Sequence, residues 1–345
     1  MSILKNRNII AIDLAKNSLY VVAENKHGAI VKDKAMTVDQ LRRFLARQPH
    51  SLVAMEACGS AHHWTWFAED LGHEVKLLPP QHVVPFREGH KTDQTDTFSI
   101  LEAAKRPKGK EAVKKSPQQL GLQTLLDIRE RYVDQKRRYS NAVRGHLLEF
   151  GIRIRRGYAA LDTHLYEVLE DADNGVPHRV RALMHRLYQS FQEAERHVQE
   201  LDKELQQVIR EVEPCQRLSQ LEGVGPVAAI SYYARIGDGR AFRNGRETAA
   251  WLGSTPQQYS TGGHVNMGHI RKRNVDRRLR ATLLQGAMSV VAKLANGKPP
   301  GNQKMRWLKD LIDRRGPRIA AVALLNKNTR TAWAMLRSGE EYVAV

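Results

Sequence analysis

Short apolar runs alternate with amphipathic segments along the first hundred residues. The amphipathic segments at 37–47 and 61–71 predict helices, and Thr37 is a candidate N-cap for the first of them. The apolar runs predict strands at 8–13, 18–24, 29–36, 51–56 and 74–78. Strands that alternate with helices predict an α/β domain in which a layered sheet carries helices on its faces.

Beyond about residue 90 the pattern becomes helical, and no further strand is expected. Segments 94–104 and 117–150 predict helices, and 160–213 predicts further long ones. Within the last segment, spaced apolar residues form one narrow seam between charged faces, typical of a coiled-coil-like hairpin. The residues of this seam are Val198, Leu201, Leu205, Val208 and Val212.

The C-terminal part predicts a mainly helical domain. Residues 218–230 read as helix, tight turn and helix, similar to a helix-hairpin-helix, in which Gly223 and Gly225 would bring backbone N–H groups to a phosphate. An ordinary helix–helix turn is the alternative. We expect a helix at 240–252, a loop at 253–268, a helix at 274–292 and a helical tail. The predicted domains are 1–112, 113–213 and 214–345.

Charge narrows the class of partner. The chain of 345 residues carries 55 Lys and Arg against 37 Asp and Glu, a net charge of +18. The excess is clustered, with six basic residues in 105–115, nine in 129–156 and six in 271–280. Clustered positive charge favours a nucleic acid partner. No apolar run approaches the roughly 20 residues of a membrane span. No signal peptide is evident, and the two cysteines fit a reducing cytosol.

Four carboxylates stand at positions suited to metal binding. Asp13 and Glu56 each end a predicted strand, at the edge where open α/β sheets bind ligands. Asp93 and Asp96 are three residues apart and share one helix face. Converging carboxylates repel unless cations neutralise them, and such oxygen-rich sites suit Mg²⁺ or Mn²⁺. The order of these acids resembles the ribonuclease H-like nuclease fold.

The predicted loop at 253–268 holds a candidate nucleophile, Ser260, followed by Thr261. A hydroxyl there would lie beside the basic cluster at 271–280, which could stabilise phosphate charge. From residue types alone, a Ser-Thr-Gly-Gly sequence is better explained as a plain flexible loop.

Taken together, these motifs resemble the DEDD insertion-sequence transposases, also called bridge-RNA-guided recombinases, which are related to the Piv DNA invertase. The resemblance runs from about residue 8 to 292 and depends on the ordered acids, the Gly-Val-Gly-Pro turn at 223–226 and the segment from Leu252 to Gly263. It implies a RuvC-like N-terminal domain in which Asp13, Glu56, Asp93 and Asp96 bind Mg²⁺. It also implies a C-terminal transposase domain whose serine, Ser260 or alternatively Thr261, forms a transient phosphoserine link to DNA.

The resemblance further implies dimers and tetramers, in which the acids of one subunit complete a site around the serine of another, and a structured non-coding guide RNA that pairs with donor and target DNA. We accordingly expect a location in a bacterial-type cytoplasm, in association with the nucleoid. The basic residues and glycines predicted to contact nucleic acid are Lys91, Arg137, Arg138, Arg144, Gly223, Gly225, Arg271, Lys272, Arg273, Arg277 and Arg278.

Three alternatives remain open on sequence alone. A RuvC-like metal-dependent endonuclease or junction resolvase would use the acids, and Ser260 would be plain loop. An architectural DNA-binding protein would use only the helix-hairpin-helix and the basic helices. An actin-like kinase is disfavoured, because it usually has glycine after the first strand's Asp, whereas Leu14 follows Asp13 here.

Overall fold

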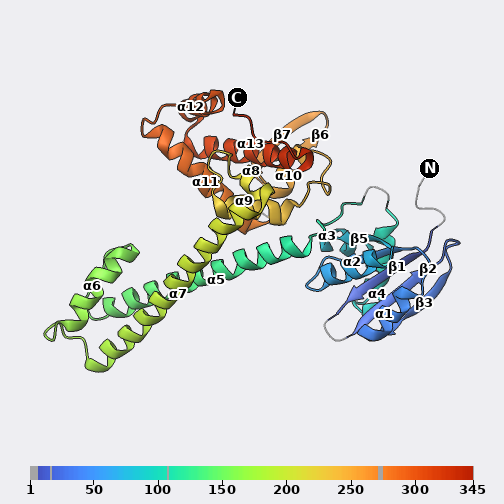
Figure 1. Ribbon diagram of the computed structural model, residues 1–345, viewed down its shortest axis with the longest axis horizontal. Helices are drawn as coiled ribbons and strands as arrows, with labels where there is room; N and C mark the ends of the chain where they lie inside the picture. Colours follow the sequence, from blue (N-terminus) through green and yellow to red (C-terminus); the bar gives the residue numbers. More distant parts are fainter. Residues whose placement is uncertain (1–6, 16–17, 107–108, 271–274, 345) are drawn as a thin grey trace. The chain divides into compact units, whose positions relative to one another are not determined.

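The computed structural model describes residues 7–15, 18–106, 109–270 and 275–344 (Figure 1). The chain divides into two compact units, Met1–Ser116 and Pro117–Val345. The division into three domains that we predict from the sequence stays a prediction.

The first unit is built on a five-stranded sheet in the order β3-β2-β1-β4-β5. Strands β1, β2 and β3 are antiparallel neighbours, whereas β4 runs parallel to both β1 and β5. All five strands agree with the sequence-based predictions. Their bounds are β1 Ile9–Leu14, β2 Leu19–Glu24, β3 Ile30–Met36, β4 Leu52–Glu56 and β5 Glu74–Leu78.

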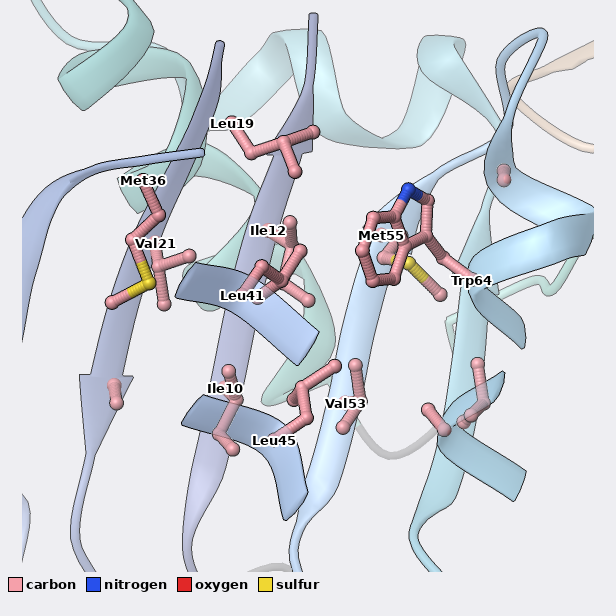
Figure 2. Packing of buried hydrophobic residues seen from close by; sticks show 14 of the residues in the cluster. Ile10, Ile12, Leu19, Val21, Met36, Leu41, Leu45, Val53, Met55 and Trp64 are labelled. Carbon is pink, nitrogen blue, oxygen red and sulfur yellow. The ribbon is translucent and has the colours of Figure 1, made fainter. Parts of the chain in front are cut away.

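Helices cover both faces of this sheet. On one face, α1 (Val38–Ala46) and α2 (Ala61–Asp70) bury alternate strand residues, and Figure 2 shows Ile10, Ile12 and Met55 among the side chains of that layer. On the other face lie α3 (Pro80–Val83), the 3-10 turn η1 (Val84–Phe86) and α4 (Asp93–Ala104). The predicted α/β class of the N-terminal part is therefore confirmed.

The second unit begins with a long antiparallel helix pair, α5 (Pro117–Leu148) and α7 (His178–Glu211), with α6 (Tyr158–Glu170) packed at its far end. Two separate apolar clusters hold this pair. The far cluster joins α5, α6 and α7 around Phe191. The near cluster joins α5 and α7 to the following helices around Leu205.

Between the two clusters the pair is held by polar contacts. Arg129 donates to Asp202 at 2.6 Å, and Lys136 donates to Glu195 at 2.5 Å. Leu205 and Val208 of the predicted seam pack in the near cluster, and the coiled-coil-like hairpin stays a prediction.

The rest of the second unit is mainly helical, as predicted. Its elements are α8 Glu213–Leu218, α9 Pro226–Ile236, α10 Gly245–Leu252, β6 Pro256–Thr261, β7 His264–Ile270, α11 Arg277–Ala295, α12 Gln303–Arg315 and α13 Pro317–Ser338.

Two predictions about this region are wrong. The segment 253–268 is not a loop, because β6 and β7 form an antiparallel hairpin around Gly262 and Gly263. The two turn glycines have φ values of 55° and 82°, as a two-residue turn between twisted strands requires. The helix predicted from residue 240 begins only at Gly245, because the Asn244 side chain caps it by accepting from the Glu247 N–H.

Within the described residues, no helix is both long enough and apolar enough to cross a bilayer.

Candidate active site

Strand alternation positions the first two acids. Residues Ile9 and Ala11 of β1 face α4, as do Leu52 and Ala54 of β4. Because side chains on a strand alternate between faces, the next residues of that series, Asp13 on β1 and Glu56 on β4, belong to the same face. These parallel strands are adjacent, so both carboxylates lie at one edge of the sheet. Both side chains are partly buried.

The other two acids open α4. The Thr92 hydroxyl accepts from the Thr95 N–H, and the Thr95 hydroxyl accepts from the Thr92 N–H, so a reciprocal cap fixes where the helix starts. Asp93 and Asp96 therefore fall in its first turn. Gln94 donates to Asp33 of β3 at 2.7 Å, which ties this helix end to the sheet.

The pKa values indicate that the four acids lie within electrostatic range of one another. Burial raises the pKa of Asp13 above its usual value, and the negative charges of Asp96 and Asp93 raise it further. Burial likewise raises the pKa of Glu56, and Asp13 and Asp96 add to that rise. The sheet edge therefore gathers negative charge contributed by all four acids, and we call Asp13, Glu56, Asp93 and Asp96 the acid edge.

Two cations adjoin the acid edge. Arg87 donates to Asp96 at 2.5 Å, and its charge lowers the pKa of Glu56. The charge of Lys91 lowers the pKa of both Asp13 and Glu56. Lys91 appears among the predicted nucleic acid contacts, whereas Arg87 does not. The only signal for Arg87 in the sequence is its place between the last strand and Asp93.

The donor set fits a hard divalent cation. It consists of carboxylates, and at Asp13 and Glu56 burial and then the neighbouring negative charges raise the pKa by more than nearby cations lower it. Within the part of the chain that the structure describes, however, no three Asp, Glu, His or Cys side chains come together in a ligating group. Asp96 is turned toward Arg87 instead. The backbone thus gathers the four acids, and Asp96 is the one whose side chain forms an ion pair among the described residues.

Ser260 lies on a different kind of element. It occupies β6, pairs with Val265 across the hairpin, and accepts from the Gln258 side chain at 2.8 Å. Every residue of β6 is exposed, as are most of β7. Thr261 adjoins the turn and pairs with His264. We call Pro256–Ile270 the serine hairpin.

The predicted nucleic acid contacts fall into several groups. Arg138, Arg277 and Arg278 are exposed, and so is Arg137, which pairs with Asp134 on its own helix. Arg271, Lys272 and Arg273 lie outside the described residues.

Arg144 has a structural role. Its guanidinium donates to the backbone carbonyls of Ser140, Arg155 and Gly157, and so binds the chain after α5 back onto that helix. Those donors are occupied within the protein, which argues against a phosphate contact there.

Gly223 also has a structural reason to be glycine. Its φ is 79°, and a Cβ there would lie 2.6 Å from the carbonyl oxygen of Gly286 on α11. The turn is held further by Glu222, whose carboxylate accepts from Lys304 at 2.6 Å and from Asn302 at 2.8 Å. The glycine therefore permits a close helix contact, whereas Gly225 caps α9 with open space around it.

Comparison with known proteins now adds to this geometry. Residues 10–152 match a family of transposases named for the DEDD acids and IS110 elements, and residues 215–302 match the "Transposase IS116/IS110/IS902 family". A "Probable family 20 transposase" of Pseudomonas aeruginosa is 40% identical over 96% of this chain and 97% of its own length. This chain belongs to the IS110/IS116 family of DEDD transposases.

Other relatives of this transposase are described by the insertion sequence that encodes them. A "Transposase for insertion sequence element IS1328" of Yersinia enterocolitica is 33% identical over 97% of this chain and 98% of its own length. A "Transposase for insertion sequence element IS1111A" of Coxiella burnetii is 32% identical over 98% and 92%. Membership makes the chain a transposase that acts on DNA, and DEDD transposases generally depend on divalent metal.

Proposed function

We propose that this transposase cuts and rejoins DNA strands with the Ser260 hydroxyl as nucleophile and with a divalent cation, Mg²⁺ or Mn²⁺, held by Asp13, Glu56, Asp93 and Asp96. The observation that carries the proposal is the acid edge itself. Two adjacent strands and the capped start of one helix bring four carboxylates together. Burial and the neighbouring carboxylates raise the pKa values of Asp13 and Glu56, so their charged forms are unfavourable there. A protein gains from such an arrangement when a cation binds there.

The sheet supports a RuvC-like, ribonuclease H-like interpretation of the first unit. Three antiparallel strands join through β1 to two parallel ones, and Asp13 and Glu56 lie at the carboxyl ends of β1 and β4. Helix α4 then brings the last two acids against the same face.

The chemistry follows from the groups present. The Ser260 oxygen attacks the scissile phosphorus, a serine–phosphorus ester forms, and the bond from phosphorus to one deoxyribose oxygen breaks. The serine proton passes to solvent and the freed sugar oxygen takes up a proton. In the second step a sugar hydroxyl of the partner strand attacks the phosphoserine and restores Ser260. A divalent cation held by Asp13, Glu56, Asp93 and Asp96 would stabilise the negative charge that develops on the reacting oxygens.

In this proposal Arg87 is the counterion of Asp96 when no cation is bound. Asp96 would hold the cation through a carboxylate oxygen, and the Arg87 donors that do not bind Asp96 would be available to a DNA phosphate.

We also propose that a structured non-coding RNA guides the reaction and that the chain works as a dimer or tetramer. Support comes from the net charge of +18 and from exposed basic side chains on α5, including Arg137 and Arg138. Binding through phosphate contacts of this kind weakens steeply as salt rises.

The test uses the whole chain with the ends of its own element, the target DNA and the transcribed flanking RNA. Asp13→Asn and Ser260→Ala should each abolish strand joining, whereas Thr261→Ala, the matched neighbour, should retain it. Full activity in both of the first two variants would overturn the proposal. Activity lost in Thr261→Ala but not in Ser260→Ala would move the nucleophile by one residue.

Trapping the intermediate separates recombination from simple hydrolysis. Denaturation during the reaction should leave DNA covalently joined to the wild-type chain and not to Ser260→Ala. Cleavage with Mg²⁺ but without any adduct would favour the endonuclease or junction-resolvase alternative. Binding without cleavage, with all partners present, would favour an architectural protein.

A further inference from the structure

A groove of about 1430 Å³ lies in the second unit beside the root of the serine hairpin. Helix α13 forms its floor, the start of α10 and part of α12 form its walls, and the hairpin residues Pro256, Gly268 and Ile270 close one end. Among the residues that the structure describes, no acid and none of the proposed nucleic acid contacts line it.

Its charge is one-sided. Of the described residues that line the groove, five are Lys or Arg and none is Asp or Glu. None of the five forms an ion pair with any residue that the structure describes. Uncompensated positive charge around a cavity is complementary to a polyanion. These cations are Arg246, Arg315, Arg318, Lys327 and Arg330.

The floor between the cations is apolar. Ile319, Val322 and Ala323 line it at helical spacing on α13, and Ile319 is 49% exposed. Two aromatic side chains, Trp307 and Trp333, lie along its length. Lys327 already sits 4.7 Å from the centre of the Trp307 ring, which is partly exposed. Aromatic faces with flanking cations are suited to stacking unpaired bases while the phosphates are held.

The walls are fixed in place. Asn326 of α13 donates to the backbone and side-chain oxygens of Ser254, which adjoins the hairpin. Gly245 lets the start of α10 approach the backbone of Arg330 so closely that a Cβ would lie 3.0 Å from it. The groove is therefore preformed, and an occupant need not order it.

We propose that this groove binds a short run of unpaired nucleotides, their bases against Trp307 and the α13 floor and their phosphates on the surrounding cations. Duplex DNA presents paired and stacked bases, so it cannot use the apolar floor. Ser260 is four residues along β6 from Pro256, which is about 13 Å at strand spacing. The groove is thus within a few nucleotides of the proposed nucleophile. The inference depends on the chain's action on nucleic acid and not on Ser260.

The experiment measures binding of three fluorescent probes to the full chain by anisotropy, at several salt concentrations. The probes are a 12-nucleotide thymidine strand, its abasic counterpart and a 12-base-pair duplex. Trp307→Ala should weaken binding of the thymidine strand roughly 5-fold or more, the lower range for loss of one stacked base. It should leave binding of the abasic strand and the duplex unchanged. Ile319→Gln, a neutral change at an exposed site, should show the same selectivity.

A matched pair tests the cations. Arg315 lines the groove and its neighbour Arg314 does not, although both are exposed at the end of α12. Arg315→Glu should weaken single-strand binding at least about 5-fold more than Arg314→Glu does. Both variants change the net charge by the same amount, so the difference between them measures contact with the groove.

Three results would overturn the inference. Equal effects of Arg315→Glu and Arg314→Glu would mean that the net charge of the protein, and not the groove, accounts for binding. Equal losses on all three probes in Trp307→Ala and Ile319→Gln would exclude base stacking. A change in oligomeric state in those variants, with strand binding intact, would make the groove an interface between copies. Ser260→Ala should bind every probe normally, so failure of the nucleophile and failure of the groove are distinguished.

Discussion

The acid edge and the serine hairpin carry the two halves of the proposed chemistry on opposite kinds of scaffold. Asp13 and Glu56 lie at the ends of buried strands, and the other two acids lie in the first turn of α4, whose start has a reciprocal cap. Packing within the first unit therefore determines the positions of all four. Ser260 lies on a two-stranded ribbon whose β6 residues are all exposed. Isolated two-stranded hairpins are marginally stable in water. A group that must hold an ion benefits from a rigid frame, whereas a group that forms a bond to DNA benefits from a scaffold that DNA can order.

The largest expected difference concerns activity. Glu56→Gln removes one carboxylate charge of the acid edge, and strand joining should fall roughly 100-fold or more while the fold persists. Gln258→Ala removes the one side chain that donates to Ser260 in the described structure, and joining should fall only a few-fold because DNA reorders the hairpin. Both are measured as joined product per unit time. A larger loss in Gln258→Ala than in Glu56→Gln would reverse the comparison.

The next difference concerns stability. Val53 is fully buried in β4, whereas Val265 of β7 is 61% exposed. The same change to threonine buries a hydroxyl in the first case, so Val53→Thr should lower the free energy of unfolding by about 2 kcal/mol. Val265→Thr should change it by less than about 0.5 kcal/mol. Urea unfolding measures both, and equal values would mean that the hairpin has a core of its own.

A smaller effect separates stability from function at the acid edge. Thr92→Ala removes the cap of α4 and Thr37→Ala removes the equivalent cap of α1, and each should cost about 1 kcal/mol of stability. Only Thr92→Ala should also lower the rate of strand joining and weaken Mg²⁺ binding, because only α4 carries Asp93 and Asp96. Matching losses of activity in both variants would indicate general destabilisation.

The smallest effect is that of pH. The pKa values of Asp13 and Glu56 are raised in the folded protein, so protonation of these groups favours the folded state. Their contribution to stability is fully present below the ordinary pKa values of these carboxyls and is lost as pH rises through the folded ones. With a chelator present, Asp13→Asn should therefore have a melting temperature a few degrees above that of the wild type at neutral pH. At acid pH the two melting temperatures should be equal. Added Mg²⁺ should remove the advantage. A variant that melts below wild type at neutral pH would contradict the charge argument.

Periodicity predicted the first unit well because buried strands are short and apolar, and because Thr37 marks its helix in the chain itself. The same reasoning missed the serine hairpin, since strands exposed on both faces lack alternation, and only the two glycines between Tyr259 and Val265 indicate a turn. Asp13 and Glu56 could be expected at one edge because they end parallel strands. Arg87 could not, because its pairing with Asp96 depends on how the segment after β5 folds back. Contacts such as Gly223 with Gly286 join residues 63 positions apart, and no local pattern encodes them.

The pair α5 and α7 has apolar clusters at its two ends and ionic contacts, Arg129 with Asp202 and Lys136 with Glu195, in between. Both ion pairs are partly buried, so dissolved salt screens them less than it screens pairs at the surface. The middle of the pair nevertheless lacks an apolar cluster like those at its two ends, and local opening is easiest where apolar contacts are fewest. Backbone amides in the middle of α5 and α7 should therefore exchange with deuterium sooner than those beside Phe191 and Leu205.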